Sequence, residues 1–428
     1  MDAKRANGNT AINATLRLTC TIIACVAALQ TNSQATNAQT CPAPGVGVPL
    51  PATGNADTMM PEVLMSFTNG LYRFPQTFLA GYSLSGVLNY NYCPQPTIIL
   101  TRYLPQTQTF LGIVYDKGIA QEINAASGTV VNQIAMAAIN QQLTALGQPT
   151  IIDLNHEVMR LPDGSTAILG QVERLYTGVQ SPPGVTVDVL GEEIVVVDPT
   201  WKNVTWVWDA YNWLPVSRKA ILGETVSAPK IPLKLASTAN DWLHGNSIYY
   251  DPSDGNLNFS MRAQDWVVKI SYQNGSGDGH LVWTLGNDGS FTVNNPYGVS
   301  SPWFSHQHDV ELDNSGNIVL FDNGNTRYAT DPTIHSRGQV WVLDTVSMVA
   351  TLQLSYDMGV YSEAYGTAEQ LPNGNYWFLA GSVQSPGVAH LFSRAVEVVP
   401  GTNGTGAAAF ILTNQDTSYR APRLAAVP

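Results

Sequence analysis

Residues 367–378, TAEQLPNGNYWF, contain the pattern that decides the fold. A short run leads into the turn Asn373-Gly374, and an apolar, aromatic run follows the turn. Asn and Gly adopt the positive backbone angles of a tight hairpin at little cost, and aromatic residues favour strands. The stretch therefore predicts two antiparallel strands joined by a tight turn.

The same pattern occurs at three earlier places, with turns at 162–164, 254–256 and 315–317. Further strand-like runs usually follow each hairpin, as at 265–270 and 280–285. Four strands per unit, recurring at roughly 50–90 residues, are typical of a β-propeller with insertions. A β-sandwich with coincidental turns is the alternative, but it gives no reason for a polar residue at one fixed place in each unit. We therefore predict an all-β chain folded as a propeller.

The other elements are expected from local patterns. One helix is predicted over 130–146, where apolar residues recur at helical spacing. At about 40–50 residues per blade, residues 105–428 have room for about six or seven blades. Residues 39–104 are rich in Pro and Gly, and we expect an irregular region that packs on the propeller. Strands are predicted at 193–198, 204–208, 266–270, 281–285, 318–321, 339–343 and 376–379.

The first 38 residues are expected to be a signal peptide and not part of the fold. Lys4 and Arg5 precede the apolar run 18–29, LTCTIIACVAAL, and Ala35 and Ala38 end candidate cleavage sites. The run is too short to cross a bilayer. A lipoprotein site at Cys25 is the alternative, but the apolar residues after it weaken that interpretation. We expect an exported protein, periplasmic or secreted, with no membrane attachment after cleavage.

Charge and cysteine content narrow the possible partners and predict a covalent link. The formal net charge is −12, and it becomes −14 when residues 1–38 are removed. An acidic chain without basic blocks argues against nucleic acid as a partner, because phosphates need clustered Lys and Arg. Cys41 and Cys93 remain after cleavage. An even pair in an oxidising compartment predicts a disulfide between them.

Three of the seven histidines head the predicted units: His156, His244 and His308. The innermost strand of every blade lines the central channel of a propeller. Residues at one position of the unit therefore converge on the axis, and we expect these three side chains to meet in one funnel. A lone histidine in a strand is more often structural, so it is their common position that indicates a site.

Several segments resemble the arylsulfotransferase family: DWLHGNS at 241–247, SMRAQD at 260–265, LVWTLG at 281–286, QHD at 307–309, LFDNG at 320–324 and SR at 336–337. They occur in the family's order, and the resemblance covers about residues 150–428. Residues 39–100 do not match the N-terminal β-sandwich of some members. The resemblance implies a six-bladed propeller. It also implies that a sulfuryl group passes from an aryl sulfate donor to a phenolic acceptor by a ping-pong reaction through a sulfohistidine. No cofactor or nucleotide donor is implied, and a homodimer is compatible with the family.

The resemblance also implies roles for particular residues. His244 and His308 match active-site histidines, and His390 in AHLF matches the nucleophile. Arg327 matches an active-site arginine, and Thr417 matches a late active-site threonine that would bind substrate. We place His156 in the funnel lining with a role in substrate binding. Trp242 is expected to stack on an aryl ring, with ordinary blade packing as its alternative.

The chemistry of these groups fits such a transfer. Neutral imidazole is a competent nucleophile near neutral pH, because its pKa is about 6.5. Arg327 would hold the sulfuryl oxygens by charge-assisted hydrogen bonds. The leaving phenoxide has a pKa of about 10 and needs a proton, which His308 or His244 would supply.

Two other functions stay open on the residues alone. His306 and His308 lie on one face of a predicted strand with Asp309 adjacent, an arrangement that a metal-dependent propeller hydrolase would use. The other is a secreted propeller that binds ligands without catalysis, since a fold does not by itself imply an activity.

Overall fold

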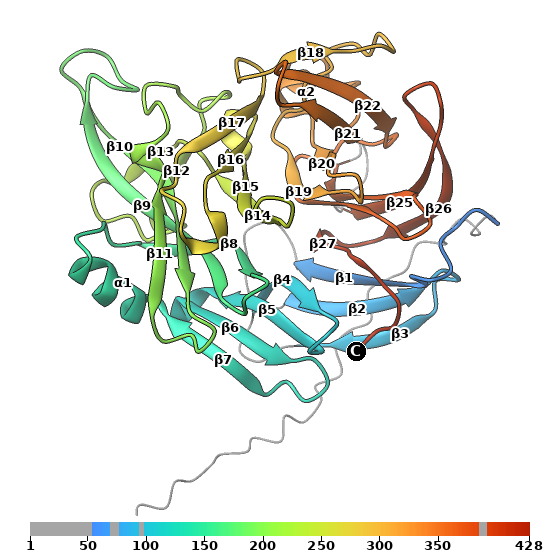
Figure 1. The fold of residues 1–428 in the computed structure, drawn as a ribbon, viewed down its shortest axis with the longest axis horizontal. Coiled ribbons are helices and arrows are strands. Elements are labelled where there is room, and N and C mark those ends of the chain that lie inside the picture. Colours follow the sequence, from blue (N-terminus) through green and yellow to red (C-terminus); the bar gives the residue numbers. More distant parts are fainter. Residues whose placement is uncertain (1–53, 69–76, 94–97, 385–391) are drawn as a thin grey trace, which may run out of the picture. The chain divides into compact units, whose positions relative to one another are not determined.

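The computed structural model describes residues 54–68, 77–93, 98–384 and 392–428. The predicted signal peptide, Cys41 and His390 lie outside these residues, and the pairing of Cys41 with Cys93 stays a prediction. The described part is an all-β fold of six small sheets arranged as a six-bladed β-propeller (Figure 1).

Three blades are plain four-stranded antiparallel sheets in sequence order. Within each blade the strands are joined in sequence, so each blade forms from local pairing. The first comprises β4 (Ile99–Leu104), β5 (Thr109–Val114), β6 (Ile119–Asn124) and β7 (Val130–Ala135). The second comprises β14 (Gly245–Asp251), β15 (Asn256–Met261), β16 (Trp266–Ile270) and β17 (Leu281–Gly286). The third comprises β23 (Gly366–Gln370), β24 (Tyr376–Val383), β25 (Phe392–Pro400) and β26 (Gly406–Asn414).

Two blades carry extra strands at their outer edges. One comprises β8 (Asp153–Arg160), β9 (Thr166–Thr177), β10 (Thr186–Val197), β11 (Val204–Asp209), β12 (Thr225–Ser227) and β13 (Thr238–Asp241). The other comprises β18 (Thr292–Asn294), β19 (His308–Leu312), β20 (Ile318–Asp322), β21 (Arg337–Asp344) and β22 (Val349–Asp357). The helices are short: α1 (Met136–Ala145), α2 (Asn325–Thr330), and the 3-10 turns η1 (Tyr115–Lys117), η2 (Ala210–Asn212), η3 (Arg262–Gln264) and η4 (Gln273–Gly275).

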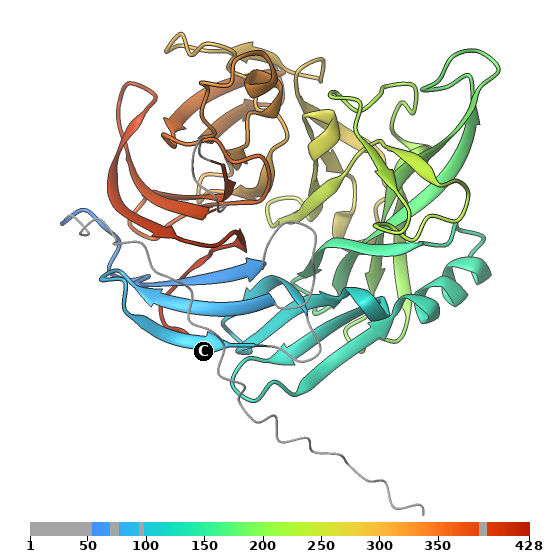
Figure 2. The ribbon, with the colours of Figure 1, turned by 180° about the vertical axis from the view of Figure 1, so that it is seen from behind.

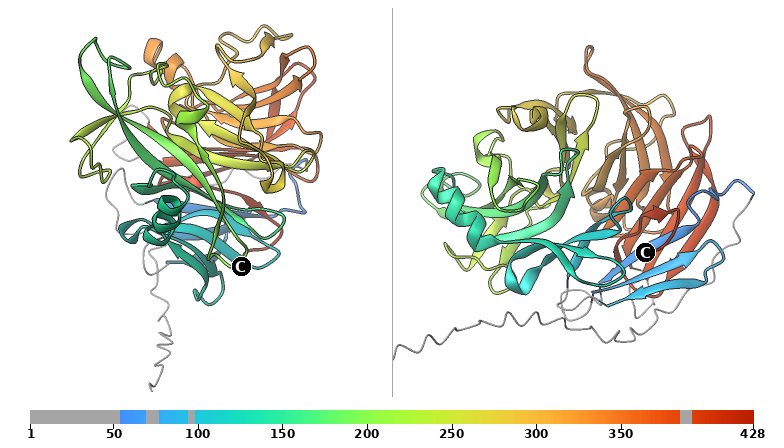
Figure 3. Two further views of the ribbon diagram at one scale, coloured as in Figure 1. Left: turned by 60° about the vertical axis from the view of Figure 1, so that its left-hand side comes forward. Right: turned by 60° about the horizontal axis from the view of Figure 1, so that its bottom comes forward.

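The sixth blade joins the two ends of the described chain. β1 (Glu62–Thr68) pairs with β2 (Thr77–Ser83), which pairs with β3 (Leu88–Tyr92). On its other side β1 pairs with β27 (Ser418–Arg420) and β28 (Arg423–Leu424) near the C-terminus. Figures 2 and 3 show these C-terminal strands against the N-terminal ones. The ring is thereby closed by strands from opposite ends of the sequence.

This blade corrects the expectation for residues 39–104. We expected an irregular region, whereas β1, β2 and β3 are strands of the closing blade and β4 begins the next one. The propeller therefore begins before residue 105. The helix expected over 130–146 also differs, because residues 130–135 form β7 and only 136–145 form α1. Every strand predicted from local patterns after residue 190 is present.

Apolar side chains fill the spaces between neighbouring blades. Trp208 of β11 meets Phe259 of β15 edge to face, with ring centroids 5.7 Å apart. Close approach also requires a glycine at Gly338 of β21, where an added Cβ would overlap the ring of Phe378 in the next blade. Blade contacts of this kind fix the start of each innermost strand relative to its neighbours. In the described residues no helix is long and apolar enough to cross a membrane.

Candidate functional site

The first strands of two adjacent blades bring His156 and His244 together. Their Nε2 atoms are 3.1 Å apart and their ring centroids 4.9 Å apart. Both residues have positive φ, 48° and 51°, which is uncommon for a side chain other than glycine. The pairing register shifts beside both, between Leu154 and Val158 and between Gly245 and Ser247. These bulges turn both imidazoles toward one point, and strained backbone of this kind often marks functional sites.

Asp241 anchors this pair. Its Oδ2 is 2.6 Å from Nδ1 of His244, three residues further along the chain. Burial would raise the pKa of Asp241, but the charge of His244 and the hydrogen bond to it outweigh burial and lower that pKa. The carboxylate therefore accepts the Nδ1–H of His244. Burial, and after it the neighbouring His244, hold the pKa of His156 well below its ordinary value, so His156 stays neutral.

His308 begins β19 and is almost fully buried. Its Nδ1 is 2.7 Å from Oδ1 of Asn323, and its Nε2 accepts a hydrogen bond of 3.3 Å from the backbone N–H of Tyr365. Burial lowers the pKa of His308 well below its ordinary value, and the positive charge of Arg262 adds to this effect. The ring is thus neutral and held in one orientation.

Tyrosine rings connect the histidines. Tyr419 of β27 lies over His156 with centroids 6.0 Å apart, and Tyr365 meets Tyr419 edge to face at 5.4 Å. The hydroxyl of Tyr419 donates to the carbonyl of His156 at 3.1 Å, and the hydroxyl of Tyr115 accepts from its N–H at 3.3 Å. Side chains from several blades therefore meet at one place, as the repeat pattern predicted.

A buried ionic network lies on the same innermost strands. Arg420 forms ion pairs with Asp309 and, at 3.4 Å, with Glu157. Arg102 pairs with the same two carboxylates and with Glu311. This network ties β4, β8, β19 and β27 together behind the histidines, and it supplies positive charge that reaches His156 and His308.

A protein-family model matches the part of the chain that carries this geometry. The model of the family "Arylsulfotransferase (ASST)" matches residues 126–420, which include His156, His244, His308 and Tyr419. The chain belongs to the arylsulfotransferase family. Membership supports aryl sulfotransferase activity in general. A search of curated proteins found no match.

Solved structures similar to this arylsulfotransferase are distant in sequence. A protein of unknown function from Bacteroides caccae has 11% identity and a TM-score of 0.43, covering 83% of this chain and 94% of that one. The periplasmic gluconolactonase PpgL from Pseudomonas aeruginosa has 11% identity and a TM-score of 0.44, covering 86% of this chain and 99% of that one. Neither similarity bears on the activity of this chain.

The remaining predicted site residues are placed differently. Arg327 lies in α2, is almost fully buried, and pairs with Asp322 at 2.7 Å. Its Nη1 also donates to the carbonyl of Trp303 at 3.3 Å. Among the described residues, no hydrogen bond or ion pair joins it to the three histidines. Thr417 is buried directly before β27.

Trp242 requires a correction. The substrate-binding role expected for it needs an accessible ring, but Trp242 is only 1% exposed. Its ring lies 5.1 Å from that of Tyr211, within the core between two blades. We therefore assign Trp242 to blade packing, which was the alternative interpretation.

The metal-hydrolase interpretation depended on His306 and His308 sharing a site. Instead His306 faces Glu224 and Asp265, and His308 faces Asn323. Burial would lower the pKa of His306, but hydrogen bonds to Asp265 and Glu224 outweigh it and raise that pKa. Within the described ranges no cluster of three or more His, Cys, Asp or Glu side chains could hold a metal ion. The two imidazoles thus belong to separate networks.

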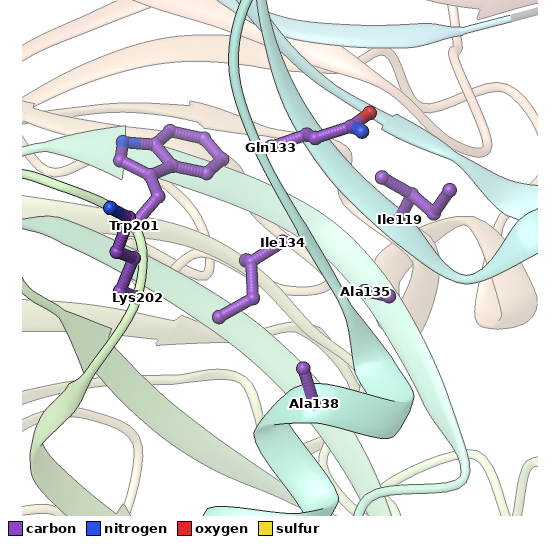
Figure 4. A pocket seen from close by; sticks show the side chains of 7 residues that line it. All are labelled: Ile119, Gln133, Ile134, Ala135, Ala138, Trp201 and Lys202. Atoms are coloured by element: carbon purple, nitrogen blue, oxygen red, sulfur yellow. The ribbon is translucent and has the colours of Figure 1, made fainter. Parts of the chain in front are cut away.

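An apolar pocket lies where β7 meets α1, with Trp201 and Lys202 from the turn between β10 and β11 beside it (Figure 4). No histidine is among the residues that line it. Its lining consists of Ile119, Gln133, Ile134, Ala135, Ala138, Trp201 and Lys202.

Sequence reasoning missed several groups at the site. Asp241 and Arg262 stand inside segments that carried the family resemblance, and the spacing of Asp241 and His244 was visible as an acid three residues before a histidine. Tyr365, Tyr419 and Arg420 have no such local pattern. Their roles come from blade-to-blade contacts that only the folded chain displays.

Proposed function

We propose that this arylsulfotransferase moves a sulfuryl group from an aryl sulfate ester to a phenol in two displacements. In the first, the neutral imidazole of His390 attacks sulfur, an N–S bond forms, and the S–O bond to the aryl group breaks. The departing phenoxide takes up a proton. In the second, the acceptor phenol oxygen attacks sulfur, the N–S bond breaks, and the phenolic proton passes to a base. Such an intermediate predicts ping-pong kinetics.

The observation that carries this proposal is the state of the described histidines. In His244, Nδ1 donates to Asp241 and Nε2 faces His156. In His308, Nδ1 faces Asn323 and Nε2 accepts from Tyr365. Both rings already use both nitrogens, so neither offers a free lone pair for nucleophilic attack. This supports the family-based assignment of His390, which lies outside the described residues, as the nucleophile.

His244 and His156 are proposed to exchange a proton with the phenolic oxygens. Their pair is partly accessible, since 28% of the His244 side chain is exposed, whereas His308 is buried. His308 keeps its family-based place in the active site as a proposal, in which Nε2 would be released from the Tyr365 N–H when substrate binds. Thr417 and Arg327 keep their family-based roles as proposals, with Thr417 two residues before Tyr419 and Arg327 in α2.

The test is a transfer assay. The exported form of the chain is incubated with 4-nitrophenyl sulfate, with and without phenol, in the absence of any nucleotide donor. We expect phenol-dependent release of 4-nitrophenol and formation of phenyl sulfate, both abolished by His390→Ala. Retained transfer in His390→Ala together with its loss in His308→Ala would move the nucleophile to His308. No transfer to any phenol would favour a binding module, and full loss of activity in a chelator would revive the metal-dependent alternative.

A further inference from the structure

Arg262 lies between the two strand starts that carry His244 and His308. It begins η3 directly after β15, and its backbone N–H donates to the carbonyl of His244 at 3.2 Å. Its Nη2 reaches the carbonyl of Glu363 at 3.5 Å. Glu363 lies two residues before Tyr365, whose N–H bonds to His308. The side chain therefore spans the space from His244 to the segment that holds His308.

The charge of Arg262 is less neutralised than that of the other arginines at the site. Its carboxylate partner is Glu224, whose Oε1 lies 3.7 Å from Nη1. This is beyond hydrogen-bond distance, and the same oxygen is already bonded to His306. Arg327, by contrast, lies 2.7 Å from Asp322, and Arg420 is shared between Glu157 and Asp309.

Accessibility distinguishes the same three side chains. Arg262 is 15% exposed, compared with 6% for Arg327 and 5% for Arg420. An incoming anion can thus reach the Arg262 guanidinium without breaking a close ion pair. Breaking the Arg327 or Arg420 pairs would leave a buried carboxylate without its partner, which is costly.

We infer that Arg262 binds the negatively charged sulfate ester of the donor and holds its sulfuryl oxygens between His244 and His308. The inference rests on the proposed function and adds Arg262 to the family-based Arg327 as a cation for the sulfuryl oxygens. A guanidinium presents two parallel N–H groups, which match two oxygens of a sulfate as they match those of a carboxylate or phosphate. A sulfuryl group in that position lies within reach of both histidine-bearing strand starts.

The electrostatic couplings agree with this position. The positive charge of Arg262 contributes, after burial, to the low pKa of both His308 and His156. It also helps to lower the pKa of Asp241, against the effect of burial. One side chain thus acts on His308, at one end of the proposed sulfuryl position, and on His156 and Asp241, the two partners of His244 at the other.

Anion binding tests the inference without requiring turnover. We expect the wild-type chain to bind inorganic sulfate and 4-nitrophenyl sulfate by isothermal titration calorimetry, and Arg262→Gln to weaken both at least tenfold. Arg262→Lys, which keeps the charge but loses the paired donors, should be intermediate. In the transfer assay Arg262→Gln should raise KM for 4-nitrophenyl sulfate and lower kcat.

Arg218→Gln is the matched control. Arg218 is 19% exposed, has an equally loose pair with Asp288 at 3.6 Å, and stacks over Trp266, and among the described residues it forms no hydrogen bond or ion pair with a histidine. It should bind both anions as the wild type does. An unchanged melting temperature separates loss of binding from loss of fold.

The outcomes separate the two proposals. Wild-type anion affinity in folded Arg262→Gln, or no binding by the wild type, overturns the inference. Loss of binding in Arg327→Gln alone overturns it as well and assigns the anion to Arg327. If Arg262→Gln loses donor binding while the wild type binds donor but sulfates no phenol, the proposed function fails and Arg262 keeps its anion site.

Discussion

His156 and His244 approach each other with their Nε2 atoms 3.1 Å apart, so a single proton lies between two imidazoles. Asp241 accepts the Nδ1–H of His244 at 2.6 Å, which leaves Nε2 of His244 to face His156. The shared proton then belongs to His156, whose burial disfavours a charged ring. His244, next to the Asp241 carboxylate, is therefore the acceptor of the hydrogen bond between the two rings.

The first prediction concerns this anchor. Asp241→Asn removes the negative charge and permits the opposite tautomer of His244, because a carboxamide can donate to Nδ1 as well as accept from it. We expect kcat for 4-nitrophenyl sulfate to fall by about 10²–10⁴, the range of general acid–base contributions, with little change in KM. The pH dependence of kcat should shift in the variant, and Asp241→Glu should restore part of the rate.

Asp209→Asn is a suitable control, because Asp209 is also a buried carboxylate paired with a cation, in this case Arg174 of the same blade. It should change stability and leave the pH profile of kcat unaltered. If Asp241→Asn keeps the wild-type rate and profile, Asp241 has no part in positioning His244 for proton transfer.

The strands were predictable where pairing is local. In β23 and β24 the turn residues and the alternating run are adjacent in sequence, so the hairpin could be found by inspection. The closing blade could not, because β1 pairs with β27 and β28, which lie near the opposite end of the chain. The Pro and Gly residues between β1, β2 and β3 made this segment look irregular in the sequence. It nevertheless contains short strands whose pairing partners are far away in sequence.

At the site, too, local patterns could be predicted from the sequence and long-range contacts could not. A repeat position predicted that His156 and His244 converge, because register fixes which residue of each innermost strand faces the axis. Arg262 and Tyr365 take part through contacts between blades, and no local spacing records those contacts. The substrate-binding role predicted for Trp242 was wrong for a related reason, since its ring packs in the core beside Tyr211 of η2, which is distant in sequence.

The second prediction concerns the closure of the ring. Arg420 of β27 pairs with Glu157 and Asp309 and donates to the backbone carbonyls of Asn246 and Gly366. Arg420→Met leaves two buried carboxylates with only Arg102 as a partner. Loss of one member of a buried ion pair costs about 3–5 kcal/mol, and we expect a loss of this size in the free energy of unfolding.

Urea unfolding followed by tryptophan fluorescence measures this loss. The exposed Lys219 provides the comparison, and Lys219→Met should change stability by less than about 0.5 kcal/mol. Equal urea midpoints for the two variants would mean that Arg102 alone neutralises the carboxylates of Glu157 and Asp309.

The last prediction uses Glu193 of β10, which is fully buried and has no hydrogen-bond partner for either carboxyl oxygen among the described residues. Burial, and then the negative charge of Asp209, raise the pKa of Glu193 to about 8 from 4.5, against the opposing effect of Arg174. The folded chain therefore keeps a proton that the unfolded chain releases above about pH 4.5, so this group makes stability fall as pH rises toward 8. The slope it contributes is about 1.4 kcal/mol per pH unit.

Glu193→Gln removes this titration and keeps the shape of the side chain. We expect its free energy of unfolding to exceed that of the wild type increasingly from pH 5 to pH 8, with the difference levelling off above that range. Other buried carboxyls, such as Glu369, titrate in both proteins and cancel in the difference. Urea unfolding at four pH values measures the two curves. Parallel curves would show that Glu193 is already ionised in the folded chain at pH 5, and that Arg174 neutralises it despite its burial.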